Sequence, residues 1–408
     1  MRMDHEEEEA AAQAAREVIR SKRLFRYYGA SNNPFQRSQV DEFEKGFREI
    51  TGVKHALAVN SGTSALVAGL RAIGVGPGDE VIVPAYTWFS TASCVLDVGA
   101  VPIIVEVDES LTLDPEAMKK AISQYTKAVI PVHVRGAPAN MDAIMEIARE
   151  HKLNVMEDCA QANGGTYKGK HLGSIGHLGA FSFHPTKIIS SCEGGMVTTD
   201  DEKIYRRAAM YHDSGVVPHM GVGLDEWLYG VNLRMSEIDA AVGLVQLRRL
   251  KGLVSDMRAK KARIKEAVVG PLQDKGMVFR RINDPGDTSL ALVFFLPTRD
   301  KVKTVVASLV REQVPASPMY QNKEYLPYDH IDLHSYNTWT PILKKRTWSA
   351  DGGPWRWHPR EVEYSEDMCP RTLDLLSRAV HIHISPDLTN EQVEQMGTAI
   401  IKVIHETF

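Results

Sequence analysis

Residues 56–107 read "ALAVNSGTSALVAGLRAIGVGPGDEVIVPAYTWFSTASCVLDVGAVPIIVEV", and this stretch decides the fold class. Short runs rich in Val, Ile and Ala are bounded by Gly and Pro, and the first two lead into segments with helical periodicity. This alternation is typical of a largely parallel sheet that is covered by helices on both faces. We therefore expect an open α/β sheet that binds its ligands at the carboxyl ends of the strands.

The same alternation continues toward the C-terminus. Strand-like runs occur at 127–134 ("KAVIPVHV") and 153–158 ("LNVMED"), with a helix-like segment between them. A long helical stretch follows at about 236–268, and the strand-and-helix pattern then starts again. The expected organisation is an N-terminal helix and arm (1–40), a large domain (41–250) and a smaller C-terminal α/β domain (251–408) that carries a Trp-rich insert (336–366).

The composition is that of a soluble globular protein. Of the 408 residues, 43% are hydrophobic and 25% are charged, which is ordinary for a folded domain. A net charge of −4 without a basic stripe argues against a nucleic-acid partner. The four cysteines lie far apart, and no apolar run reaches the ~18 residues of a membrane span. These features predict a cytoplasmic protein without a membrane partner.

The segment Asn60–Ser64 ("NSGTS") falls where the first predicted strand ends and a helix begins. Free N–H groups at a helix N-terminus bind phosphate, glycine permits a close approach, and hydroxyl groups add donors. The alternative is an ordinary Ser or Thr helix cap. The segment is a candidate phosphate site whose interpretation depends on its neighbours.

Two other residues make the phosphate interpretation more specific. Lys187 lies between the β-prone run "AFSFH" and the turn at Gly194-Gly195, and Asp158 ends the strand-like run "NVMED". Alone, the lysine reads as a solvated loop residue and the aspartate as a helix cap. Together with a phosphate site they are the groups that pyridoxal phosphate needs, namely a Schiff-base lysine, a carboxylate for the pyridinium nitrogen and anion donors.

Two further motifs resemble binding sites, but neither is interpreted as one. The segment "GVGPGDE" (74–80) lacks GxGxxG spacing and precedes a strand, so it is predicted to be a turn. His381 and His383 in "HIHIS" share one face of a predicted strand, which is a possible metal pair. The sequence offers no third ligand beside them, so we expect packing histidines and no metal.

Six motifs identify a family. The segments "NSGTSAL", "GDEVIVPAYTW", "EDCAQANGG", "GSIGHLGAFSFHPTK", "EGGMVTTDD" and "YGVNLRMSEIDAAVGLVQL" occur in this order. Together they resemble the DegT/DnrJ/EryC1/StrS aminotransferases from about Glu42 to the C-terminus. The resemblance implies the α/β fold type I of pyridoxal-phosphate-dependent transferases, like aspartate aminotransferase, with a mixed, mostly parallel sheet in the large domain. It also implies transfer of an amino group from glutamate or glutamine to a keto sugar or keto cyclitol.

The resemblance assigns four residues to the cofactor ring. Lys187 would form the Schiff base with pyridoxal 5'-phosphate, and Asp158 would bond the pyridine nitrogen. Trp88 would stack on the ring. Gln161 would approach the ring and its phenolic oxygen. Lys187 and Asp158 are therefore the predicted catalytic residues.

Four more residues are assigned to the phosphate. Gly62, Thr63 and Ser182 match the family's phosphate-binding positions. Asn232 matches a residue that the family lends to the phosphate site of the neighbouring subunit. The resemblance thus implies a homodimer with shared active sites.

The substrate residues are the least specific part of the interpretation. Many relatives read H-x-Y-G-Q where this chain has "HVRGA" (133–137), which leaves His133 as a candidate in a divergent loop. Arg26 in "FRYYG" precedes the first core strand, where fold type I enzymes often bring residues to the site. An arginine suits a phosphate or carboxylate, and Trp355 in the insert would suit the apolar face of a sugar or cyclitol. The alternative for Trp355 is packing of the insert onto the small domain.

Two other functions are alternatives to amino transfer. A related sugar dehydratase would have histidine in place of Lys187. A catalytically inactive sugar-binding or regulatory relative would not need an intact set of Lys187, Asp158, Thr63 and Ser182. The sequence distinguishes neither the keto acceptor nor glutamate from glutamine as the donor.

Overall fold

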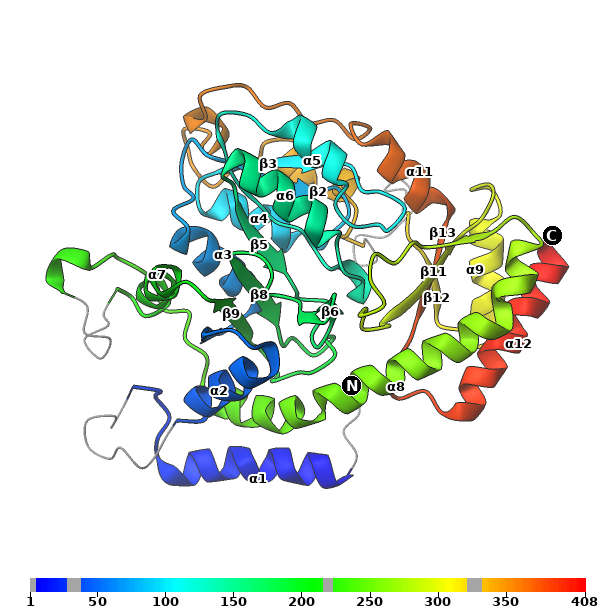
Figure 1. Ribbon diagram of the computed structural model, residues 1–408, viewed down its shortest axis with the longest axis horizontal. Coiled ribbons are helices and arrows are strands. Elements are labelled where there is room, and N and C mark those ends of the chain that lie inside the picture. Colours follow the sequence, from blue (N-terminus) through cyan, green and yellow to red (C-terminus); the bar gives the residue numbers. More distant parts are fainter. Residues whose placement is uncertain (1–4, 28–37, 216–222, 321–331) are drawn as a thin grey trace.

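The computed structural model describes residues 5–27, 38–215, 223–320 and 332–408. Most of the expected arm, at 28–37, lies outside these ranges. Helices pack on both faces of a central sheet, and a smaller sheet with its own helices lies beside it (Figure 1). The fold class expected from the sequence is confirmed. None of the helices in the described ranges is long and apolar enough to cross a lipid bilayer.

The central sheet has seven strands in the order β1-β9-β8-β5-β4-β2-β3. The run from β3 to β8 is parallel, whereas β9 is antiparallel to both of its neighbours. Because β5 and β8 are adjacent and parallel, their carboxyl ends meet at one edge of the sheet. The strands are β1 (His55–Val59), β2 (Glu80–Pro84), β3 (Val101–Val105), β4 (Thr126–Val129), β5 (Asn154–Asp158), β8 (Leu178–Ser182) and β9 (Gly195–Thr199).

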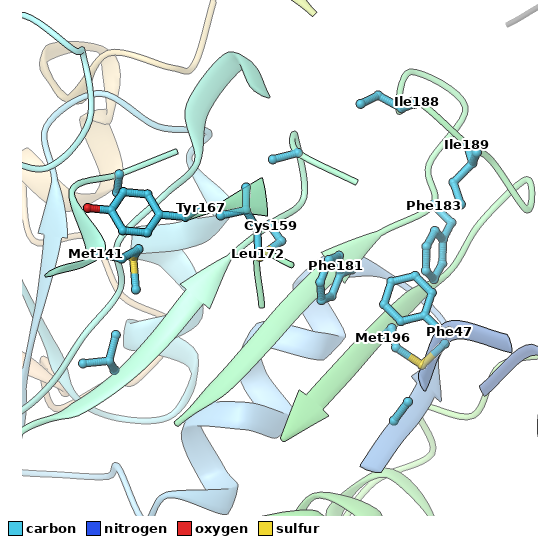
Figure 2. Close-up of a cluster of buried hydrophobic side chains, with 14 of the residues drawn as sticks. Phe47, Met141, Cys159, Tyr167, Leu172, Phe181, Phe183, Ile188, Ile189 and Met196 are labelled. Atoms are coloured by element: carbon cyan, nitrogen blue, oxygen red, sulfur yellow. The ribbon is translucent and has the colours of Figure 1, made fainter. Parts of the chain in front are cut away.

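Two groups of helices enclose this sheet between two apolar cores. In the first core, Phe47 packs edge to face on Phe181 of β8 and on Phe183 directly after it, at centroid distances of 4.8 and 5.7 Å (Figure 2). Successive strand residues point to opposite faces, so Ser182 between these two rings points to the second core and its helices. The first face carries α2 (Gln39–Thr51), α5 (Pro115–Ala121), α6 (Met141–His151) and part of α8, and the second carries α3 (Gly62–Ala72), α4 (Ser90–Asp97) and α7 (Glu202–His212).

The smaller domain is built on an antiparallel sheet in the order β10-β11-β13-β12. Leu292 and Phe294 of β11 face a core formed with the helices, while Ala291, Val293 and Phe295 face the large domain. The elements are β10 (Val278–Phe279), β11 (Ala291–Phe295), β12 (Ala316–Pro318), β13 (Ala379–His383), α9 (Val302–Arg311) and α12 (Asn390–Thr407).

Helix α8 (Glu237–Gln273) is shared by the two domains. Ser236 caps its N-terminus by accepting from the N–H of Asp239. Its first half, including Leu250 and Met257, packs in the large-domain core, and its second half, including Ile264, packs in the small-domain core. The boundary expected at residue 250 falls inside this helix.

Shorter elements complete the described chain. Helix α1 packs along α8 (Figure 1), and a strained turn, η1, follows β4. The elements are α1 (His5–Ser21), η1 (Val134–Gly136), β6 (Thr166–Tyr167), β7 (Lys170–His171), η3 (Leu224–Glu226), η6 (Tyr336–Thr338), α10 (Thr340–Leu343), η7 (Trp355–Trp357) and α11 (Pro370–Arg378).

The Trp-rich segment lies on the large domain, which corrects its expected place in the small one. Tyr336 and Trp339 are buried in the core formed with α3 and α4. Arg360 donates to Glu80 at the start of β2 (2.5 Å), and Tyr364 donates to the carbonyl of Pro102 in β3 (2.8 Å). The later part of the segment is therefore fixed to the amino ends of these strands, whereas its first residue, Tyr336, donates its N–H to the carbonyl of Ala85 (2.9 Å), just after the carboxyl end of β2.

Candidate active site

Asp158 is a buried carboxylate at the carboxyl end of β5. Its Oδ2 accepts from Thr91 Oγ1 (2.8 Å), and its Oδ1 accepts from the N–H of Ala160 (3.1 Å). Burial raises the pKa of this carboxyl, while the two hydrogen bonds and the charge of Lys187 act in the opposite direction. Within the described ranges, Asp158 forms no ion pair. A buried carboxylate that is held but not neutralised suits a cationic ligand.

The N-terminus of α3 lies against the end of β8. Ser61 caps the helix by accepting from the N–H of Ser64 (3.0 Å), so the ordinary cap is present and leaves Gly62 and Thr63 in the first turn. A Cβ on Gly62 would lie 2.6 Å from Cβ of Ser182, and one on Gly195 would lie 2.2 Å from the carbonyl oxygen of Ser61. The two glycines thus let helix and strands approach closely enough to bring the three predicted phosphate residues together.

Lys187 lies in the loop after β8 and is partly buried. Burial lowers the pKa of its amine most, Arg135 lowers it further, and Asp158 raises it. The structure therefore brings the two predicted catalytic residues into electrostatic contact. A less basic amine is a better nucleophile and proton carrier at neutral pH.

Gln161 and Trp88 meet at a histidine that the sequence analysis missed. The amide of Gln161 donates from Nε2 to His334 Nε2 (3.3 Å), and the ring of Trp88 lies edge to face on the His334 ring, with centroids 5.2 Å apart. His334 in turn donates from Nδ1 to Asp332. Burial lowers the pKa of His334, which favours this neutral tautomer. No sequence pattern marks His334, because it lies 173 positions from Gln161.

Arg135 also lies at this site, in the loop that departs from the family pattern. Its N–H donates to Gln161 Oε1 (2.8 Å), and its guanidinium donates to the Tyr86 hydroxyl (3.2 Å) and to Asp332 (3.4 Å). The loop is divergent in sequence, but Arg135 is not among the predicted site residues. The local signal was available, since arginine stands where relatives have tyrosine.

His133 is corrected from a substrate residue to a structural one. Its side chain is fully buried, accepts the N–H of Ala139 at Nδ1 (3.0 Å) and donates from Nε2 to Glu157 (3.0 Å). With Cys159 these groups lie close enough to hold a metal. However, the histidine lone pair is already used, and the Glu157 carboxylate also accepts three backbone N–H groups. Hydrogen bonding therefore accounts for this cluster.

Arg26 and Trp355 are not placed for substrate binding in their own chain. The guanidinium of Arg26 pairs with Glu44 (2.5 Å) and Asp41 (3.2 Å) and is almost fully buried. Trp355 donates to the Tyr364 hydroxyl (3.3 Å), which is anchored at the amino end of β3. That end is opposite the sheet edge that carries Asp158. The packing alternative holds for Trp355, although on the large domain.

The remaining predicted residue, Asn232, lies in a segment that pairs with the end of β1, where the carbonyl of Leu233 accepts from the N–H of Asn60 (2.8 Å). The side chain of Asn232 is exposed and accepts the N–H of Arg234 (3.2 Å). It follows an exposed apolar segment in which Tyr229 is 84% exposed and Trp227 is 41% exposed. The exposed apolar segment lies after α7 along the chain.

Comparisons with known proteins show the family to which the chain is similar. The model of the DegT/DnrJ/EryC1/StrS aminotransferase family matches residues 6–338. The chain is 45% identical over 212 residues to GDP-perosamine synthase of Caulobacter vibrioides, a match that spans 52% of this chain and 57% of that protein. It is 34% identical over 414 residues to L-glutamine:2-deoxy-scyllo-inosose aminotransferase of Streptoalloteichus tenebrarius, across 97% and 92% of the two chains.

Solved structures show the same fold. An aminotransferase from Psychrobacter cryohalolentis superposes with a TM-score of 0.80 at 28% identity, covering 97% of each chain. NtdA of Bacillus subtilis, solved with bound cofactor PMP, gives a TM-score of 0.78 at 23% identity, covering 99% of this chain and 83% of that one. At 23% identity, the similarity to NtdA shows only that the two chains share a fold.

Proposed function

The chain belongs to the DegT/DnrJ/EryC1/StrS aminotransferase family, and from this premise we propose that it moves an amino group from glutamate or glutamine to a keto sugar or keto cyclitol. It is an aminotransferase that depends on pyridoxal phosphate. The relatives support the acceptor class, because one is named for GDP-perosamine and another for 2-deoxy-scyllo-inosose with L-glutamine.

One observation carries the proposal. Asp158 is buried, held by Thr91 and the N–H of Ala160, and has no cationic partner among the described residues. An uncompensated buried carboxylate is costly, so it fits a ligand that brings a protonated ring nitrogen. When bound, pyridoxal phosphate supplies an electron-accepting ring, and Asp158 would keep its nitrogen protonated.

The opposite end of the site suits the phosphate. Gly62 and Thr63 offer N–H groups at the start of α3, and Thr63 and Ser182 add hydroxyl donors. The space above Gly62 is so limited that a methyl group there would meet Ser182. We assign these three residues to the phosphate, Trp88 and Gln161 to the ring, and Lys187 to the covalent link.

Lys187 is assigned the proton transfers. Its lowered pKa leaves more of the amine neutral near pH 7, so Nζ can accept a proton from the donor's α-carbon and later return one to the acceptor's. Thr91 keeps the Asp158 carboxylate oriented, since its own hydroxyl oxygen accepts from the Thr87 hydroxyl (2.8 Å). Together these groups set up both halves of the exchange.

The test is a donor and acceptor screen with the purified protein. Amine formation on the acceptor is followed by mass spectrometry, and cofactor binding by its visible absorbance. Lys187→Ala should lose the absorbance band and the turnover together, whereas the control Lys203→Ala, exposed on α7, should keep both. Loss of water without gain of an amine would indicate the dehydratase instead, and no turnover with any acceptor would indicate a binding protein.

We also propose a cytoplasmic homodimer with shared active sites. Its support is the exposed segment around Trp227 and Tyr229, which lies beyond α7 next to Asn232 (Figure 1). Exposed apolar patches on folded proteins commonly mark interfaces. The four free cysteines fit a reducing compartment. In sedimentation, Tyr229→Asp should shift the protein toward monomer, while Asn232→Ala should remain dimeric and bind the cofactor phosphate more weakly.

A further inference from the structure

Arg135 has a backbone conformation that its residue type disfavours. Its φ is +52°, in the left-handed region that residues other than glycine rarely adopt. The turn is held by residues of the small domain. Arg280 donates to the carbonyl of Val134 (3.0 Å), and the N–H of Thr288 donates to the carbonyl of Gly136 (3.0 Å). Non-glycine residues kept in such a conformation cluster at functional sites.

The guanidinium of Arg135 is held by hydrogen bonds that use only some of its N–H donors. Nε donates to Tyr86 (3.2 Å), and Nη2 makes one long contact with Asp332 (3.4 Å). Nη1 has no hydrogen-bond partner among the described residues, and 22% of the side chain is exposed. The edge formed by Nη1 and Nη2 is therefore available for the paired hydrogen bonds that arginine makes with a carboxylate.

The neighbours of Arg135 place this edge beside the reacting groups. Its N–H is bound to Gln161, which contacts His334, and His334 contacts Trp88. The positive charge of Arg135 also acts on the Lys187 amine, after burial and Asp158. The titratable or charged groups around Arg135 are thus Tyr86, Asp332, His334 and Lys187, together with Arg280 and His383 of the small domain. His381 also faces it from the small domain.

We propose that Arg135 binds the α-carboxylate of the amino donor. This inference rests on the proposed function, because an α-amino acid carries its carboxylate one carbon from the amine that must reach the position of Lys187 Nζ. A keto sugar or cyclitol has neutral hydroxyl groups at that distance from its carbonyl, and a phosphate of a nucleotide-linked acceptor would lie farther away. A cation close to the lysine therefore matches the donor better than the acceptor.

The decisive experiment compares donors with and without the carboxylate. L-Glutamine and L-glutamate are compared with their decarboxylated counterparts, 4-aminobutanamide and 4-aminobutyrate, in single turnovers of the holoenzyme followed by cofactor absorbance. Arg135→Gln should lower kcat/KM for the amino acids by about 10- to 100-fold and leave the two amines nearly unchanged, since hydrogen bonds to charged groups contribute on this scale. Arg135→Lys should give an intermediate ratio. Arg281→Gln, which removes a half-exposed arginine from another ion pair, should leave the ratio as in the wild type.

A binding measurement complements the kinetics. The dissociation constant of α-methyl-L-glutamate, which has no α-proton to lose, should rise about 10-fold in Arg135→Gln. A variant that loses activity equally toward amino acids and amines, or one that slows only the step with the keto acceptor, would overturn the assignment. If the wild-type protein converts no donor at all, the proposed function fails rather than this inference alone.

Discussion

At the scale of single residues, the site depends on two buried ionisable groups, Asp158 and Lys187. Asp158 has two hydrogen bonds and no cationic partner among the described residues, so burial raises its pKa. Lys187 shows the complementary shift, a pKa lowered mainly by burial. Each shift is a free energy that a ligand of the right charge can recover. The groups whose burial is unfavourable are therefore those that select the cofactor.

Asp158→Asn should retain the fold and most of the cofactor affinity but slow amino transfer by about 100-fold or more. The amide has the shape of the carboxylate and can still bond Thr91 and the ring, yet it carries no charge to keep the ring nitrogen protonated. Single-turnover kinetics and cofactor titration separate the two effects. A variant that transfers amines at the wild-type rate would rule out this role.

Arg26→Ala should lower stability rather than substrate affinity. The change leaves Glu44 buried without its cation, which costs about 3 kcal/mol for a pair of this kind. Urea unfolding measures the loss, and donor and acceptor KM values should stay constant. In the double variant with Glu44→Gln, much of the loss should be recovered. A changed KM with unchanged stability would instead restore Arg26 to the substrate site.

At the scale of elements, the site is formed where α3 begins and where β5 and β8 end. The sheet brings Asp158 and Ser182 to one edge, and the N-terminus of α3 faces them. Close packing of α3 on β8 requires glycine, because a Cβ at position 62 would lie 2.6 Å from Ser182 Cβ. Helix position and phosphate geometry are thus fixed by the same contact.

Gly62→Ala should weaken cofactor binding by about 10-fold or more, since a forced shift of helix or strand costs about 1–3 kcal/mol. Fluorescence titration with pyridoxal phosphate measures the change. The matched control is Gly252→Ala in α8, where nothing lies within 4 Å of the added methyl group. The control should bind normally and gain slightly in stability. If both variants bind pyridoxal phosphate with equal affinity, Gly62 does not contribute to the phosphate site.

The sequence predicted those parts of the site that lie at the ends of regular elements. Strand and helix periodicity located Asp158 and Gly62, because each ends or starts an element that local patterns define. It could not locate His334, which reaches Gln161 only through tertiary folding. The sequence could not decide the role of Trp355, because an aromatic residue in a loop can equally contact a sugar or pack the loop onto a domain. Hydrogen bonds of Tyr364 and Arg360 to the large domain decide for packing.

At the scale of the whole molecule, the face between the domains is polar around the site and apolar beside it. Tyr86, Val134 and Val293 pack in one cluster across this face. His381 of β13 lies there too, buried and bonded to Ser317 (3.1 Å). Burial lowers its pKa well below 6.5, and the charges of Arg135 and His383 add to the shift. Contact between the domains therefore depends on a neutral histidine.

Stability should fall as pH decreases below about 6.5. The unfolded chain takes up a proton at His381 in this range, whereas the folded protein does not, so unfolding gains about 1.4 kcal/mol per pH unit for each such group. Burial also lowers the pKa of His334 and His383. Urea unfolding between about pH 7.5 and 5.5 tests this. His381→Asn should flatten the slope, while His405→Asn on the exposed side of α12 should not.

Because helix α8 belongs to both cores, one domain cannot be exchanged in evolution without the other. Leu250 and Met257 belong to one core and Ile264 to the other, so a cut anywhere in this helix leaves both cores incomplete. Exchange of the small domain between two relatives would have to carry the whole of α8 and the partners of both its halves. Donor preference in such enzymes is therefore expected to diverge through loops such as 133–137, rather than by replacement of a domain.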